Sequence, residues 1–415
     1  MGIKNLKKFI RDKFPNEIQK SNLNNFYGQI FTMDIMSYIY KSKISLGDNW
    51  LNSIINLIKL FKKFNIHVNI IFEGDSPIEK SKEKENRRKQ RKLQEERIIC
   101  LKKDFEIYHS TGIVSSLLKD VCENVDKNDK DKIDKLLHFN SNTIEKKNDI
   151  EYLSDHMINL INQFIHKKEK QIVNISDRDI EKIKNICDMF RIPYLQSQNE
   201  AETLCCKLSE NVNFHKNSIG VISEDTDILA YGTKILLCDL NISNGDCNIL
   251  YLPSILESMK ITYNSFLNFC VLSGTDYNTN IPGYGSVKCY ELILKYNSIE
   301  NIFENEFTNI NKKVNETIEK KKKKLEESNL KKIETDIWDE IQEENSYADI
   351  STEIIKRDML HSISMFSLKI SMSELKVNYW DSNVNIENLF ENCLRYNVNF
   401  NCLQNLWKNN IKLIQ

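Results

Sequence analysis

The sequence lacks the cysteine pattern of a zinc site or a disulfide scaffold. None of its 11 cysteines belongs to a CxxC pair, and the only adjacent pair is Cys205-Cys206. No cluster of cysteine and histidine offers the spacing of a tetrahedral zinc site, and no apolar secretory segment precedes the cysteines. We therefore expect reduced thiols in an intracellular protein.

The sequence also lacks a long apolar run and a net charge. No apolar stretch reaches the roughly 18 residues of a membrane-spanning helix, so we expect no membrane partner. Gly2 stands near the start, but Leu6 occupies the place where a myristoylation signal has serine or threonine. Lys plus Arg number 58 and Asp plus Glu number 59, so only the local distribution of charge can indicate a polyanionic partner.

Short strand-like segments alternate with amphipathic helices through much of the chain. Buried strands are predicted at residues 28–34, 66–73, 191–195, 217–225 and 234–240. Helices are predicted at residues 50–64, 77–100, 179–190 and 199–210. This order predicts an α/β fold with a mainly parallel central sheet flanked by helices. After residue 255 helices dominate.

The run Lys320–Lys324 indicates a solvated helix or linker, with a nuclear-import patch as the alternative.

Carboxylates stand at the ends of the predicted strands. They are Asp34, Glu73, Glu200, Glu202, Glu224, Asp225 and Asp227, and Asp276 follows a later helix. One such acid is usually a solvated residue or a helix cap. In an open parallel sheet, however, the strand ends meet at one edge, where crowded carboxylates need cations. Oxygen ligands suit Mg²⁺ or Mn²⁺, and two such ions about 4 Å apart commonly serve phosphodiester hydrolysis.

A dense basic segment follows Glu73. Its members include Lys80, Lys84, Arg87, Arg88 and Arg91. A solvated helix face is the plain interpretation. The position directly after a predicted metal-ligand strand favours contact with a phosphate backbone and with charge that develops on the scissile phosphate.

A glycine turn opens another predicted helix at Ile281-Pro282-Gly283-Tyr284-Gly285. Backbone N–H groups at such a helix start can face a phosphate. A Gly-x-Gly turn alone is weak evidence, because most such turns only connect elements.

Taken together and in order, these segments resemble the flap endonuclease/XPG family of structure-specific 5′ nucleases. The matching segments are MGIKNLKKFI, MDIMSYIY, FEGDSPIEKSKEKENRR, QNEAET, SEDTDILAYG and LSGTDYNTNIPGYG, and YWDSNVNIENLFENCLRYNV matches more faintly. The match covers about residues 1–97 and 175–295. It departs at Glu73, where the family has aspartate, at residues 98–175, and at the C-terminus, which has no sliding-clamp box, so clamp binding is doubtful.

The resemblance implies a PIN-like nuclease core, a helical arch over the active site and a helix-hairpin-helix element of the H2TH type. It implies two Mg²⁺ or Mn²⁺ ions, with K⁺ at the glycine turn. The implied metal ligands are Asp34, Glu73, Glu200 and Glu202 for one ion, and chiefly Asp225, Asp227 and Asp276 for the other. The implied catalytic residues are Lys80, Arg87, Asp34 and Asp225. The implied DNA-binding residues are Gly2, Tyr40, Lys80, Lys84, Arg87, Arg88, Arg91, Gly283, Gly285 and Lys288.

We expect five parts along the chain: an N-terminal nuclease region (1–100), an arch (101–170), an internal nuclease region (171–255), a helix-hairpin-helix element (256–300) and a helical C-terminal region (301–415). The expected function is cleavage of branched DNA at 5′ flaps and 5′ ends by a monomer, in the nucleus or at another site of DNA replication. The alternatives are a 5′→3′ exonuclease, a bubble-cutting repair nuclease, and a catalytically silent nucleic-acid-binding relative.

Overall fold

The computed structural model describes residues 3, 5–118, 144–147, 150–153, 155–210, 218–331 and 351–367. The chain divides into two compact units. The first is Met1–Tyr38, Leu51–Ser81 and Arg178–Gln415, and the second is Ile39–Trp50 and Lys82–Asp177. Gly2 lies outside the described residues, and so do residues 379–398, which carry the fainter match, and the C-terminal residues 401–415.

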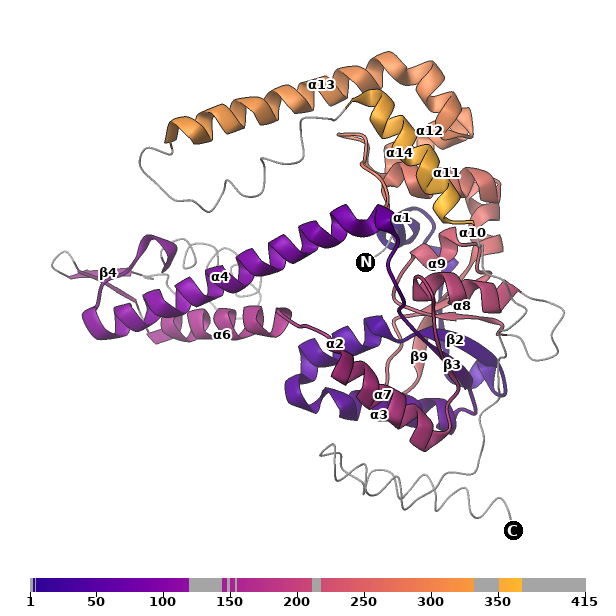
Figure 1. The fold of residues 1–415 in the computed structure, drawn as a ribbon, viewed down its shortest axis with the longest axis horizontal. Coiled ribbons are helices and arrows are strands. Elements are labelled where there is room, and N and C mark those ends of the chain that lie inside the picture. The colour runs from indigo at the N-terminus through magenta and orange to yellow at the C-terminus, as the bar shows by residue number, and fades with distance from the viewer. Residues whose placement is uncertain are drawn as a thin grey trace, which may run out of the picture. The chain divides into compact units, whose positions relative to one another are not determined.

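The first unit is built on a seven-stranded sheet in the order β1-β9-β8-β7-β2-β3-β6. Figure 1 labels its strands β2, β3 and β9. The strands are β1 (Ile18–Asn22), β2 (Ile30–Asp34), β3 (His67–Phe72), β6 (Tyr194–Gln196), β7 (Gly220–Ile222), β8 (Ile235–Cys238) and β9 (Asp246–Tyr251). The five strands from β8 to β6 run parallel, and β9 and β1 add an antiparallel edge. The prediction of a mainly parallel sheet flanked by helices is confirmed.

Helices of the first unit surround the sheet and extend beyond it. They are α1 (Leu6–Lys13), α3 (Trp50–Lys63), α7 (Asp177–Phe190), α8 (Ala201–Glu210), α9 (Asp227–Ala230), α10 (Leu252–Met259), α11 (Tyr263–Ser273), α12 (Ser286–Tyr296), α13 (Ile299–Lys331) and α14 (Thr352–Met365). Helix α2 (Met36–Leu46) is shared by both units. The lysine run at 320–324 lies in α13, which agrees with its interpretation as a helix.

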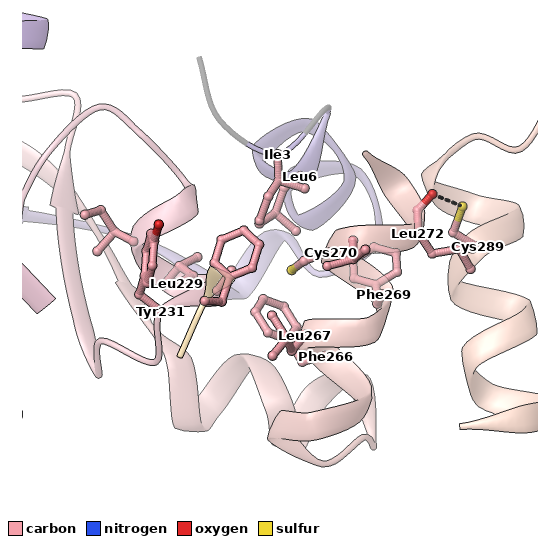
Figure 2. Close-up of a cluster of buried hydrophobic side chains, with 14 of the residues drawn as sticks. Ile3, Leu6, Leu229, Tyr231, Phe266, Leu267, Phe269, Cys270, Leu272 and Cys289 are labelled. Atoms are coloured by element: carbon pink, nitrogen blue, oxygen red, sulfur yellow. Dashed lines mark hydrogen bonds between the residues drawn. The ribbon is translucent and has the colours of Figure 1, made fainter. Parts of the chain in front are cut away.

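Helix α11 is the centre of the first unit's apolar core. Every residue from Ser265 to Ser273 is buried, as expected for a helix that other elements cover on all sides. Figure 2 shows Phe266 and Phe269 of this helix beside Ile3 and Leu6 from the N-terminal segment. Helices α12 and α14 pack against α11. The loop that carries Asp276 therefore begins at the end of a fully buried helix.

The second unit has a small core of its own, between α4 (Ser81–Thr111) and α6 (Asp155–Gln171). A short antiparallel pair, β4 (Ile144–Lys147) and β5 (Ile150–Leu153), precedes α6. None of the described side chains from residue 81 to 97 is buried. The apolar residues that follow are spaced at helical intervals and form the core with α6; they are Ile98, Leu101, Phe105 and Tyr108, opposite Ile161 and Ile165.

Helix α4 is therefore a solvated basic segment joined to a packed segment.

Among the helices in the described ranges, none combines the length and the hydropathy needed to cross a membrane.

We expect Leu101→Ala to destabilise the second unit by about 2–5 kcal/mol, because it removes a large side chain that is 2% exposed. Hydrogen exchange of the α6 amides measures this local stability and should accelerate. The neighbouring Ile99→Ala is the matched control: Ile99 is 53% exposed, so its loss should change protection little. Equal exchange rates in both variants would contradict a separate core here.

Candidate active site

Three adjacent strands bring acids to one edge of the sheet. Asp34 is the last residue of β2 and pairs with Ile71 of the parallel strand β3, and Glu73 follows two residues later. On the other side of β2, strand β7 ends at Ile222, and Asp225 follows in the next loop. The strand order thus places these acids at one edge of the sheet.

Gly74 allows two acid-bearing loops to approach each other. Its N–H donates to the carbonyl of Asn199 at 2.8 Å. A Cβ on Gly74 would stand 2.1 Å from the carbonyl oxygen of Ser197, which no side chain can tolerate. The backbone contact holds the loop with Glu73 against the loop with Glu200. Glycine at this position is therefore a requirement of the site and not of a turn.

Of the two acids that flank Gly74, Glu73 is the one within the site. Its Oε2 accepts a hydrogen bond of 3.1 Å from the N–H of Ala201, at the start of α8. Burial raises the pKa of Asp34 and of Glu202, and the charge of Glu73 adds to both effects. Asp75, by contrast, is exposed. The glutamate therefore occupies the place that the sequence pattern gives to an aspartate.

The loop after β7 fixes two further acids and links them to Asp34. The N–H of Asp227 donates to Oδ1 of Asp225 at 2.9 Å. The Ser223 hydroxyl accepts from the N–H of Asp225 at 3.1 Å and donates to Oδ2 of Asp34 at 3.4 Å. The backbone of Ile3 also lowers the pKa of the Asp227 carboxyl, against the larger effect of burial. The N-terminal segment therefore reaches the site.

Lys80 lies among these acids at the end of the short helix η4 (Ile78–Lys80). Its ammonium forms an ion pair with Oε1 of Glu200, and Oδ2 of Asp276 is 4.0 Å away. Its Nζ is 4.9 Å from the ring centroid of Tyr277. Burial opposes the charged form of Lys80, but the acids, Glu200 foremost, raise its pKa above the usual value. Lys80 is therefore a fixed positive charge at neutral pH.

The buried acids repel one another. Burial first, and then the charges of Glu73 and Asp225, raise the pKa of Asp34 to about 7. Burial and neighbouring carboxylates likewise raise the pKa of Glu202 and of Asp227 well above the usual range, although Lys80 lowers both. Such crowding, with a net negative charge in a low-dielectric environment, is typical of a site that holds cations.

The donor set fits a hard divalent cation. Oε2 of Glu202 and Oδ1 of Asp227 are buried and have no hydrogen-bond partner in the described part of the chain. An oxygen atom that is buried without a donor is costly unless a cation or a proton satisfies it. Among the described residues, no three Asp, Glu, His or Cys side chains are already gathered into a formed cluster. The acids thus influence one another's pKa values, but among the described residues their oxygens are not arranged around a single metal position.

Other residues predicted for the site belong to the second unit, on α4 and α2. Nε of Arg87 donates to Glu83 one turn earlier at 2.9 Å. Nη1 of Arg91 donates to the Tyr40 hydroxyl at 3.2 Å. Also on α4, and exposed, are Lys84 and Arg88. Each unit thus holds part of the predicted set.

The glycine turn precedes α12, as predicted, and Gly285 is the residue at the helix N-cap. Gly283 has a φ of +75°, which favours glycine. A Cβ at either glycine would meet nothing within 4 Å. The ammonium of Lys288 lies 3.8 Å from the ring centroid of Tyr284. The backbone at the start of α12 is therefore open to a ligand.

Sequence reasoning missed the phenols that hold Glu200. Oε2 of Glu200 accepts a hydrogen bond from the hydroxyl of Tyr277, and the hydroxyl of Tyr231 is 3.3 Å away. Both tyrosines lie inside matching segments, directly after Asp276 and four residues after Asp227. Their position was therefore visible in the sequence, but their common target was not.

Two sequence families match the chain. The XPG N-terminal domain matches residues 1–95, and the XPG I-region matches residues 191–276. A probable RAD2-like endonuclease of Invertebrate iridescent virus 6 is 30% identical over 322 residues, which span 73% of each chain. Flap endonuclease 1 of Plasmodium chabaudi chabaudi is 25% identical over 335 residues, which span 74% of this chain and 57% of that protein.

A solved structure of the catalytic core of Rad2 in complex with DNA substrate has a similar fold. It superposes with a TM-score of 0.52 and 14% identity, and 94% of each chain is covered.

The pKa of Asp34 leads to a prediction about pH. With a folded-state pKa of about 7, the folded protein keeps a proton that the unfolded chain releases from about pH 4. The contribution of the Asp34 carboxyl to the free energy of unfolding is therefore fully present below about pH 4. It is lost as the pH rises through about 7, where the folded protein must also ionise this buried group. Asp34→Asn removes that loss and keeps an acceptor for the Met36 N–H.

In metal-free buffer, Asp34→Asn should therefore raise the melting temperature by about 3 °C or more near pH 8, with a smaller difference near pH 5. The control is Asp75→Asn, which removes an exposed carboxylate and should change the melting temperature little. A pH-independent difference for Asp34→Asn would refute the assigned coupling.

Proposed function

The chain belongs to the XPG/Rad2/FEN1 family of structure-specific nucleases, and from this premise we propose that it is a divalent-metal-dependent 5′ nuclease that cuts branched DNA at 5′ flaps and 5′ ends. As a member it is a phosphodiesterase. One observation carries the proposal: acids follow three neighbouring strand ends at one edge of the sheet, and Lys80 forms an ion pair there with Glu200 and lies 4.0 Å from Asp276.

We propose that this edge of the sheet holds two Mg²⁺ or Mn²⁺ ions. Asp34, Glu73, Glu200 and Glu202 would hold one of them, directly or through water. The ligands of the other would chiefly be Asp225, Asp227 and Asp276. When bound, such ions supply an activated water and positive charge at the scissile phosphate. The unpartnered oxygens of Glu202 and Asp227 support this assignment.

Lys80 is proposed to bind the scissile phosphate. Its raised pKa keeps the ammonium charged, and its side chain retains 14% exposure at the edge of the acid cluster. A charged donor in this position can hold an oxygen of the scissile phosphate and offset the charge that develops there. Glu200 and Tyr277 restrict the ammonium to one place. Arg87 is proposed for the same phosphate, from the basic segment of α4.

Two further elements are proposed to bind DNA. We propose that α11 and α12, with the loop between them, act as the helix-hairpin-helix element. Its backbone N–H groups at Gly283 and Gly285 would face a duplex phosphate, with K⁺ and Lys288 nearby. We propose that the arch expected at residues 101–170, together with the basic side chains of α4, admits a single strand. Tyr40 is proposed to stack on a base, and the Arg91 contact fixes its hydroxyl.

Three alternative functions are compatible with the same site residues. A 5′→3′ exonuclease or a bubble-cutting repair nuclease would use the same acids on a different DNA structure. A silent relative would have lost ligands, whereas here a single ligand position departs from the pattern and Glu73 keeps its charge. The active assignment is therefore favoured, in replication, repair or recombination.

Cleavage of a labelled 5′-flap duplex tests the proposal. The purified protein with Mg²⁺ should release one oligonucleotide, and Asp225→Asn should lower the rate at least about 100-fold, because it removes one ligand charge. A ladder of mononucleotides would instead identify an exonuclease. Preferential cutting of a bubble over flap, nicked and gapped DNA would identify a repair nuclease.

A protein that leaves every member of this DNA panel intact, in Mg²⁺ and in Mn²⁺, would refute nuclease activity and favour the silent alternative. Asp75→Asn is the matched control for Asp225→Asn, because it removes an exposed carboxylate near the same edge. Equal rates for wild type and Asp225→Asn would also refute the assignment.

Glu73 and Asp75 can be separated by rate. Glu73→Asp restores the family residue and should keep or raise activity, although the shorter side chain withdraws the carboxylate by about one C–C bond. Asp75→Asn should change the rate less than about twofold, because Asp75 is exposed. A large loss in Asp75→Asn together with normal activity in Glu73→Gln would reverse the assignment.

A further inference from the structure

Phe366 lies against the two tyrosines that hold Glu200. It follows the last turn of α14, and its side chain is 3% exposed. Its ring centroid is 4.9 Å from that of Tyr231 and 5.6 Å from that of Tyr277, with the second pair nearly perpendicular at 85°. These are favourable geometries for aromatic contacts. A residue far along the chain thus packs directly against the support of a candidate ligand.

The two phenols form a directed pair of hydrogen bonds. Each hydroxyl has one hydrogen to donate. Tyr277 donates to Oε2 of Glu200, and the hydroxyl of Tyr231 is closer to the Tyr277 oxygen, at 2.9 Å, than to Glu200, at 3.3 Å. Because the Tyr277 hydrogen goes to Glu200, the Tyr231 hydroxyl is the donor in both of its contacts, to the Tyr277 oxygen and to Oε2 of Glu200. Burial raises the pKa of both phenols, so both remain protonated donors.

Tyr277 also touches the other member of the ion pair. The ammonium of Lys80 lies 4.9 Å from its ring centroid, and the same ammonium pairs with Oε1 of Glu200. The ring of Tyr277 thus orients Lys80, and its hydroxyl orients Glu200. A rotation of this one ring would displace both groups together.

Helix α14 makes a second contact next to Lys80, between His361 and Glu79. This contact is weaker than the packing of Phe366 on the two tyrosines. Nε2 of His361 lies 3.4 Å from Oε1 of Glu79, and both side chains are partly or largely exposed. Exposed pairs of this kind contribute about 0–1 kcal/mol. The buried ring of Phe366, which contacts both tyrosines, is therefore the stronger constraint on the site.

We propose that Phe366 is a positioning residue for the nuclease reaction: its ring holds Tyr231 and Tyr277 in place, and these hold Glu200 and Lys80 in the geometry that cleavage requires. The inference rests on the proposed function. It connects the C-terminal helix to the chemistry at the sheet edge, without contact between Phe366 and DNA.

The test compares Phe366→Ala with Met359→Ala, under conditions in which both variants are folded. Met359 is a buried residue of the same helix, and neither tyrosine contact involves it. Both changes should lower the melting temperature, because both remove large buried side chains. Phe366→Ala should also lower kcat by about tenfold with KM for flap DNA within about twofold, since small misplacements of reacting groups reduce rate strongly.

Met359→Ala should keep kcat within about twofold of the wild type, and Phe366→Leu, which refills the space, should recover most of the kcat lost in Phe366→Ala. An active wild type with equal kcat values for Phe366→Ala and Met359→Ala would overturn the inference alone. An increase confined to KM would also overturn it, because it would indicate a role in binding. A wild type without any cleavage would overturn the proposed function, and this inference with it.

Discussion

Repulsion among buried carboxylates at one edge of the sheet is the constraint on which the site depends. Burial and like charges raise the pKa values of Asp34, Glu202 and Asp227 together. The protein offsets this repulsion locally with Lys80 and with backbone N–H donors to Asp34 and Glu73. The apolar cluster around α11, which includes Tyr231 and Phe366, supplies the folding stability that offsets the rest of this repulsion. Stability elsewhere thus allows a strained site.

Much of this arrangement was predictable because it follows from local patterns. Strand and helix periods indicated a mainly parallel sheet, and the acids at strand ends then had to meet. The antiparallel edge was not predictable in the same way. Strand β1 is the polar segment IQKSN, without an alternating apolar face, and it is held in the sheet by pairing with β9. Only the tertiary structure reveals that partner.

The finer features depend on contacts between distant segments. The sequence shows Gly74 only as the residue between two acids, whereas its close backbone contact with the loop before α8 depends on the tertiary structure. Tyr231 and Tyr277 stood in recognisable segments, but nothing in the sequence indicated that both act on Glu200. Phe366 lay outside every matching segment. The packed half of α4 was likewise hidden, because its partner α6 follows a long interval.

The central claim is that the carboxylates form one shared cation site. Calorimetric titration of the protein with Mn²⁺ in the absence of DNA tests it most directly. The account predicts about two ions per chain. Glu202→Gln and Asp227→Asn should each weaken the affinity at least about tenfold, because each carboxylate has an oxygen without a hydrogen-bond partner among the described residues. Binding that is absent in the wild type, or unchanged in both variants, would contradict it.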